Sequence, residues 1–248
     1  MTRSLRALAA AFAVSAVGAA PAAAKVVEIG PTPGVTAHAS CPQTCRVVTR
    51  TSGLQTEVSG MSNPYVVQSN GRIVAFTVDL GDPPTSYIKG STNAAGFDQT
   101  YGGPASMRII VLRRDKKLWI RGVGYYKKVV ASSGTYPLAT FFGTVSQFAL
   151  HESIPVRAGD YVGVTVPTWA PILAVNLGSK EGWRASRPKG QCGDEQHPEY
   201  FINQTSLMKT GAGAFFRCHF TTARLTFSVT EVTDPQPKYD PNHKPIRR

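Results

Sequence analysis

The stretch that decides the fold is RIVAFTVDL, residues 72–80. Apolar side chains recur in it at every second position, at Val74, Phe76, Val78 and Leu80. Thr77 and Asp79 fall on the opposite face. A period of two is typical of a strand that buries one face and exposes the other. We therefore predict a half-buried strand here, with the four apolar side chains in the core.

The same alternation recurs along the chain. Further strands are predicted at residues 107–113, 118–123, 146–151, 161–166, 172–177 and 224–232. The first two would form a hairpin around the polar turn 114–117, and residues 154–160 form another turn. No apolar stripe of period 3.6 runs longer than two turns, and two long loops span 81–105 and 178–213. We predict an all-β fold, an antiparallel, jelly-roll-like β-sandwich with long loops.

The N-terminus has the three parts of a secretory signal peptide. A basic head precedes an uncharged, Ala-rich stretch at residues 7–20, and an A-x-A end stands before Lys25. The apolar part is shorter than the ~20 residues that cross a bilayer. We predict a signal peptide at residues 1–24, cleaved near Ala24, and a secreted, extracellular product.

The remaining chain of about 220 residues fits one domain. Residues 25–40 contain Pro and Gly and are predicted to form an extended N-terminal segment. The β-sandwich domain is predicted at 41–233. Residues 234–248 hold four prolines among charges, which predicts a disordered, Pro-rich basic tail. No later stretch is long enough to span a membrane.

The chain is strongly basic. Its formal charge is +12, with 27 basic and 15 acidic residues, and loss of Arg3 and Arg6 with the signal peptide would leave +10. This charge favours anionic partners, and outside the cell these are wall polymers and acidic polysaccharides. The other interpretation is that the charge only keeps the protein in solution. Nucleic acid is not expected as the native partner, since no recognised binding module is present.

Four cysteines remain after export, at Cys41, Cys45, Cys192 and Cys218. An even number in an exported chain predicts two structural disulfides. A zinc site is the weaker alternative, because Cys41 and Cys45 are widely spaced and Cys192 and Cys218 lie far apart. Local pairing, 41 with 45 and 192 with 218, is favoured, although crossed pairings that tie the first strand to the last ones are also open.

A resemblance to extracellular proteins supports the same all-β fold class. The strings FAL (148–150) and IPVRAGDYVG (154–163) look like a turn-and-strand signature of extracellular jelly-roll sandwiches. With SCPQTC (40–45) and TVPTWAP (165–171), they make residues 40 to about 233 resemble a set of uncharacterised secreted actinobacterial β-sandwich proteins. The resemblance implies a fold and a compartment, and it implies no activity.

The sequence shows no catalytic constellation. A Gly-x-Ser-x-Gly elbow is absent, and two Ser-x-x-Lys matches, at 86–89 and 206–209, are interpreted as chance. The histidines are scattered. The densest acidic patch, Asp194, Glu195 and Glu199 beside His197, is interpreted as a solvated loop rather than a cation site. We predict no cofactor and no metal.

Binding is easier to support than catalysis. An aromatic ring can stack on a sugar, and a nearby arginine can hold a carboxylate or phosphate. The candidate ligand-binding residues are Trp183, Arg184, Arg187, Tyr125 and Tyr126. The alternative for Trp183 is a place in the core, which is the favoured interpretation for Trp169.

A second basic group comprises Arg113, Arg114, Lys116, Lys117, Arg121, Lys127 and Lys128. It could face a polyanion or protect a sheet edge. These features predict a secreted, non-catalytic binding or cell-surface interaction module for an anionic wall polymer or carbohydrate. The alternatives are a secreted hydrolase with a site assembled from distant loops and a structural envelope protein.

Overall fold

The computed structural model describes residues 23–85, 93–114, 125–188, 190–192 and 209–235. Nearly all of the predicted signal peptide and tail lie outside these residues. Residues Ala24–Asp234 form one unit, to which everything below refers. None of the helices in the described part of the chain is long and apolar enough to cross a membrane.

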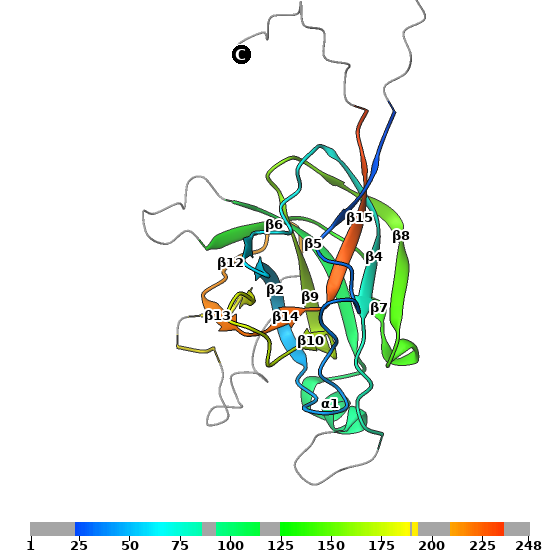
Figure 1. The fold of residues 1–248 in the computed structure, drawn as a ribbon, viewed down its shortest axis with the longest axis vertical. Helices are drawn as coiled ribbons and strands as arrows, with labels where there is room; N and C mark the ends of the chain where they lie inside the picture. The colour runs from blue at the N-terminus through cyan, green and yellow to red at the C-terminus, as the bar shows by residue number, and fades with distance from the viewer. Residues whose placement is uncertain (1–22, 86–92, 115–124, 189, 193–208, 236–248) are drawn as a thin grey trace, which may run out of the picture. The chain divides into compact units, whose positions relative to one another are not determined.

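Two larger antiparallel sheets make up the fold (Figure 1). The four-stranded sheet has the order β1-β15-β4-β8, comprising β1 (Val26–Ile29), β15 (Phe227–Thr233), β4 (Gly71–Asp79) and β8 (Val145–Val156). The nine-stranded sheet follows the order β12-β6-β5-β9-β2-β11-β13, with β3 beside β2 and β7 beside β5.

The strands of the second sheet are β2 (Val48–Val58), β3 (Met61–Ser62), β5 (Ser106–Arg114), β6 (Tyr126–Ser132), β7 (Tyr136–Pro137), β9 (Tyr161–Ala170), β11 (Gly182–Ala185), β12 (Gly213–Phe215) and β13 (Cys218–Thr221). A short pair joins β10 (Leu173–Ala174) to β14 (Arg224–Leu225). The predicted all-β antiparallel sandwich is confirmed, while the jelly-roll detail stays a prediction.

The core lies between the sheets, and β5 shows how the sequence builds it. Ile109 and Val111 enter the main core, whereas Ile110 and Leu112 join a second apolar cluster. Successive side chains of a strand point to opposite faces, so this second cluster lies on the outer face of the nine-stranded sheet. Because β5 is buried on both faces, its apolar residues follow one another without alternation.

The predicted strand at 72–80 is present as β4, but one of its side chains was assigned to the wrong face. The pairing with β8 jumps from Ile73↔Ile154 to Ala75↔Ala149. This irregularity shifts the alternation by one residue. Ile73 is therefore fully buried in the core while Val74 is only partly buried. Phe76, Val78 and Leu80 are buried in the main core, as predicted.

Asp79 was predicted on the solvent side, yet it is buried. Its carboxylate accepts the backbone N–H of Ala39 at 3.1 Å and lies 3.3 Å from Nδ1 of His38. The segment after β1 therefore covers this face of β4.

Most of the other predicted strands are present in the structure. Strand β5 contains the predicted range 107–113, β8 contains 146–151, and β9 contains 161–166. The range 224–232 is divided between β14 and β15, and 172–177 contains the short β10. The hairpin partner of β5 is β6. The strand predicted at 118–123, with most of its turn, lies outside the described residues.

The first long loop contains a helix that the periodicity did not predict. Helix α1 (Ala94–Tyr101) begins where the Asn93 side chain accepts the N–H of Gly96 at 2.7 Å, and it ends at Gly102 with φ of 82°. Its one buried side chain, Phe97, packs on Trp169 at 4.9 Å between ring centroids. Two turns carrying a single buried residue give no detectable helical period. A three-residue 3₁₀ turn, η2 (Ala139–Phe141), precedes β8.

The disulfides join Cys41 to Cys45 and Cys192 to Cys218. This is the local pairing that the sequence analysis favoured. The first bridge closes a short turn ahead of β2, and the second ties the segment after β11 to the start of β13.

Candidate anion-binding pocket

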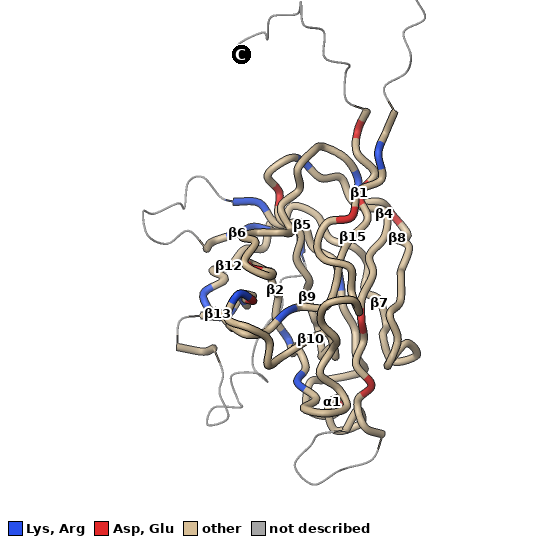
Figure 2. The backbone as a smooth tube through the Cα atoms, viewed as in Figure 1, with Lys and Arg blue, Asp and Glu red and all other residues tan. Residues whose placement is uncertain are grey.

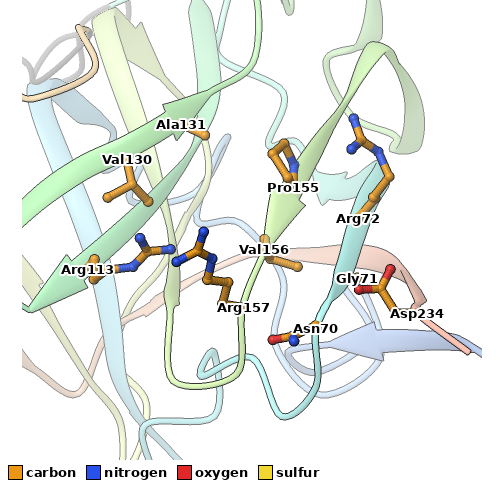
Figure 3. Close-up of a pocket in the computed structure, with 10 residues that line it drawn as sticks. All are labelled: Asn70, Gly71, Arg72, Arg113, Val130, Ala131, Pro155, Val156, Arg157 and Asp234. Atoms are coloured by element: carbon orange, nitrogen blue, oxygen red, sulfur yellow. The ribbon is translucent and has the colours of Figure 1, made fainter. Parts of the chain in front are cut away.

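A pocket of about 400 Å³ lies between the two sheets (Figure 3). One wall comes from β5 and β6, and the other from β4, β8 and the residue that follows β15. It is lined by Asn70, Gly71, Arg72, Arg113, Val130, Ala131, Pro155, Val156, Arg157 and Asp234. Pockets of this size hold small ligands or a single unit of a larger one.

The turn between β8 and β9 supplies Arg157. Gly159 has φ of 87°, a conformation that glycine adopts without steric cost. Asp160 accepts the backbone N–H of Arg157 at 3.0 Å, as aspartate does in turns. The side chain of Asn70 accepts the N–H of Ala158 at 3.1 Å. These bonds hold the backbone from which Arg157 projects, and the turn predicted at 154–160 is confirmed.

Arg113 is held in place by Asp160. Its Nε and one terminal nitrogen donate to the two carboxylate oxygens at 2.6 and 2.7 Å. This hydrogen bonding raises the pKa of Arg113, against the opposing effect of burial. The Asp160 residue is only 2% exposed, whereas the Arg113 side chain is 40% exposed. Arg113 therefore keeps donor groups that can face a ligand while its orientation is fixed.

Arg157 faces Arg113. Figure 3 shows the two guanidinium groups pointing toward one another across the pocket. Within the described part of the chain, no hydrogen bond or ion pair engages the Arg157 guanidinium. Two like charges at close range repel, and an anion between them would relieve the repulsion.

The third arginine, Arg72, has a different orientation. It donates to the hydroxyl and to the carbonyl oxygen of Ser153, at 2.6 and 2.7 Å. In Figure 3 its guanidinium is turned away from Arg113 and Arg157. Arg72 therefore adds positive charge at the rim, while Arg113 and Arg157 form the pair that could hold an anion.

A carboxyl group lies next to Gly71, one of the residues that line the pocket. A Cβ atom placed on Gly71 would be 2.6 Å from Oε1 of Glu231. Glu231 is 1% exposed, and its Oε1 has no hydrogen-bond partner in the described part of the chain. Burial, and then the negative charge of Asp234, raise the pKa of Glu231.

The structure brings two of the five residues that the sequence proposed as a binding site into contact, and a third lies next to them in the chain. The Arg184 guanidinium lies over the Tyr125 ring, 3.8 Å from its centroid. Tyr126 is on the adjoining strand β6 and packs edge-on against Phe215 at 5.0 Å. Tyr125 is the most exposed of these rings. The contact between Arg184 and Tyr125 is a cation–aromatic pair that joins β11 to the residue before β6.

Trp183 and Arg187 lie elsewhere. Trp183 is 4% exposed and stacks on Phe220 in the core at 4.7 Å. It precedes Arg184 on β11, and consecutive side chains of a strand face opposite sides. Arg187 is 2% exposed and donates to the carbonyl oxygen of Thr49 at 3.0 Å, and burial lowers its pKa to about 10. Neither side chain presents a surface to a ligand.

The second basic group is divided between two faces. Cross-strand pairs place Arg113 opposite Lys128 and Arg114 opposite Lys127, where Figure 2 shows basic positions along β5 and β6. Lys127 is buried with its amine 4.0 Å from the centroid of the Tyr161 ring. Burial and then the charge of Arg114 lower the pKa of Lys127 to about 8. Lys116, Lys117 and Arg121 lie outside the described residues.

No cluster of three or more His, Cys, Asp or Glu side chains suited to a metal occurs in the described part of the chain. The acidic patch around His197 falls outside it.

No protein-family model, curated protein or solved structure matches this chain.

Proposed function

We propose that this chain is an exported, non-catalytic module that binds an anionic polymer, such as a wall polymer or an acidic polysaccharide. The observation that carries the proposal is the pair of facing guanidinium groups, Arg113 and Arg157, in a pocket between the sheets. Two disulfides are consistent with an oxidising, extracellular compartment.

The lining of the pocket suits a charged group carried on a sugar or polyol. Guanidinium groups bind carboxylates and phosphates through paired N–H donors. Beside them, Val130, Ala131, Pro155 and Val156 offer an apolar wall on which the C–H face of a ring could rest. One repeat of a charged polymer would thus meet both donors and apolar surface.

The experiment is a binding titration of the full chain against a polyuronate and a poly(glycerol phosphate), at several salt concentrations. We expect binding that weakens as salt rises and that falls at least tenfold in Arg157→Gln. Arg217→Gln is the matched control, because Arg217 is exposed and packs on Phe215 outside the pocket. Equal losses in the two variants would mean that charge alone, and not the pocket, binds the polymer.

A secreted hydrolase is the second candidate. Glycoside hydrolysis needs two carboxyl groups, one of which has a raised pKa and acts as the acid. Asp234 lines the pocket and Glu231, whose pKa is raised, lies behind the lining residue Gly71, so the two meet that description in part. New reducing ends formed from a polysaccharide by the wild type, and not by Glu231→Gln, would favour this function over binding alone.

A further inference from the structure

We infer that Glu231 determines which anions the pocket accepts: it couples anion binding to its own protonation and restricts the pocket to singly charged groups. This inference rests on the proposed function, because it concerns the ligand of the same pocket. The shared chemistry of the accepted ligands is one negative charge on oxygen, as in a uronic-acid carboxylate or a phosphodiester.

The position of Glu231 follows from the pairing of β15 with β4. Glu231 pairs with Ile73, and Thr233 pairs with Gly71. Residues that lie directly opposite share a face, and Ile73 is part of the core. Glu231 therefore points into the space between the sheets, next to Gly71, which lines the pocket.

A carboxyl group in that place is costly unless it is neutral or paired. Oε1 of Glu231 has no hydrogen-bond partner among the described residues. The absence of a side chain at Gly71 leaves room for this oxygen, since a Cβ there would come within 2.6 Å of it. The residue is thus buried, incompletely paired and separated from the pocket by a glycine.

Burial, together with one neighbouring carboxylate, favours the neutral form of Glu231. The titratable or charged side chains on the elements packed around it include Lys25, Glu28, Tyr65, Arg72, Asp79, Arg108, Arg113, Arg114, Lys127, Lys128, His151, Glu152, Arg157 and Asp234. Glu28 is turned toward Ser228 and accepts from Thr230 at 2.9 Å, and Arg72 is engaged by Ser153. Burial first, and the charge of Asp234 second, raise the pKa of Glu231.

The charge balance of the pocket then depends on this one proton. Three arginines line the pocket, opposed by Asp234 in the lining and by Asp160 bound to Arg113. Among the lining residues and Asp160, three positive and two negative charges leave a net charge of +1 while Glu231 is neutral, and zero once it is ionised. A singly charged anion matches the first state, whereas a second negative charge on the ligand has no counterpart.

Binding and protonation must influence each other equally. An anion in the pocket disfavours the ionised form of Glu231, and by linkage the neutral form binds the anion more tightly. Affinity therefore falls as the pH rises through the pKa of Glu231. A coupling of this kind changes affinity by roughly 5-fold to 10-fold, at the lower end of typical values.

The experiment measures binding of galacturonate, diethyl phosphate and glycerol phosphate to the full chain between pH 5 and pH 8. Glycerol phosphate takes on its second charge near pH ~6. In the wild type, the two singly charged probes are expected to lose affinity by up to roughly 5-fold to 10-fold as Glu231 ionises, and glycerol phosphate is expected to lose more. The separate carboxylate and phosphodiester probes show which source of the single charge is preferred.

Glu231→Gln keeps the site neutral at every pH, so its affinity for the singly charged probes is expected to stay constant. The matched control is Glu28→Gln, which removes an equal charge from the hydrogen-bonded face of β1 and should keep the wild-type profile. Identical pH profiles in the wild type and in Glu231→Gln would overturn the inference.

A measurement on the unaltered chain covers the case in which Glu231→Gln fails to fold. Carbon-13 NMR of the Glu231 carboxyl group should show its titration midpoint move to higher pH when galacturonate is added, and an unmoved midpoint overturns the inference. If Arg157→Gln abolishes binding while Glu231→Gln changes nothing, the proposed function stands and this inference fails. If no probe or polymer binds at any pH, both fail.

Discussion

Arg113 donates two hydrogen bonds to Asp160, and the same carboxylate also accepts the backbone N–H of Arg157. One buried carboxylate therefore orients one guanidinium and fixes the backbone of the residue that carries the other. Arg113 comes from β5 and Arg157 from the turn between β8 and β9, so Asp160 links these two segments of the pocket.

Asp160→Asn should lower the free energy of unfolding by about 2–3 kcal/mol, because hydrogen bonds to charged groups are lost and the new amide presents N–H groups to other donors. Urea denaturation checks this value. Asp82→Asn, at an exposed position, is the control and should change little. Equal stability of Asp160→Asn and wild type would show that the pair positions nothing.

Gly71→Ala should destabilise the protein by about 1–3 kcal/mol through overpacking. A Cβ there would lie 2.5 Å from the carbonyl oxygen of Val232 and 2.9 Å from Cα of Thr233, and these backbone atoms cannot move aside. Thermal unfolding measures the loss. Gly134→Ala is the control, since no atom lies within 4 Å of a Cβ at that position. A Gly71→Ala protein as stable as Gly134→Ala would contradict the packing described for β4 and β15.

The buried pair of Glu181 and Arg224 should make stability depend on pH. Arg224 donates to both carboxylate oxygens, at 2.9 and 2.5 Å. Burial alone would raise the pKa of Glu181, but the hydrogen bonds from Arg224 and Ser59 outweigh it and leave the pKa below its usual value. This stabilisation is present above the unfolded-state pKa of ~4.3 and disappears as the pH falls through the folded-state pKa.

Glu181→Gln should therefore cost about 3–5 kcal/mol at neutral pH, because Arg224 is left buried without its counter-charge. The difference from wild type should shrink in acid. Urea titrations at pH 7 and pH 3.5 test both statements, with Glu152→Gln on the exposed face of β8 as control. A difference that grows in acid would reverse the sign assigned to this pair.

The two disulfides should contribute unequally. In the chain-entropy model, the bridge between Cys192 and Cys218 contributes about 3.5 kcal/mol and the short bridge between Cys41 and Cys45 about 2 kcal/mol, because the longer loop loses more freedom in the unfolded chain. Paired Cys→Ser variants of each bridge, compared by urea denaturation, measure the two values. A larger loss at the short bridge would count against the chain-entropy explanation.

Neighbouring residues of β11 should respond differently to truncation. Trp183→Ala should cost about 3–5 kcal/mol, because a buried ring that stacks on Phe220 is lost. Arg184→Ala should cost about 1 kcal/mol or less, the value of a partly exposed cation–π contact. Denaturation curves of the two variants give the comparison, and equal costs would mean that the two side chains do not face opposite sides.

The strands could be predicted from the sequence because their signal is local. Alternation along 72–80 shows on its own that a strand is present and that Phe76 and Val78 are buried. It could not show the irregularity after Ile73, because that depends on how β8 pairs with β4. The short helix α1 was missed for a related reason, since one buried residue in two turns is too little pattern to detect.

The candidate site was only partly accessible to sequence reasoning. The sequence placed Arg113 in a basic group and Arg157 in a predicted turn, but no motif or spacing indicated that the two side chains lie close together. The proposed set around Trp183 combined residues that are adjacent in the chain, and a strand separates adjacent residues onto opposite faces. The arginine pair and Glu231 belong to segments far apart in sequence, and no local pattern indicates that they meet.

By itself, the amino-acid sequence determined the class of fold, the strands and their turns, and it favoured the disulfide pairing that is observed. Only the tertiary structure decided which charged side chains face one another. The physical reason is that alternation specifies on which side of its own strand a residue lies, whereas the strands that become neighbours are chosen by packing over the whole core. The meeting of Arg113 and Arg157 in a pocket that Gly71 separates from the buried Glu231 is a result of that choice.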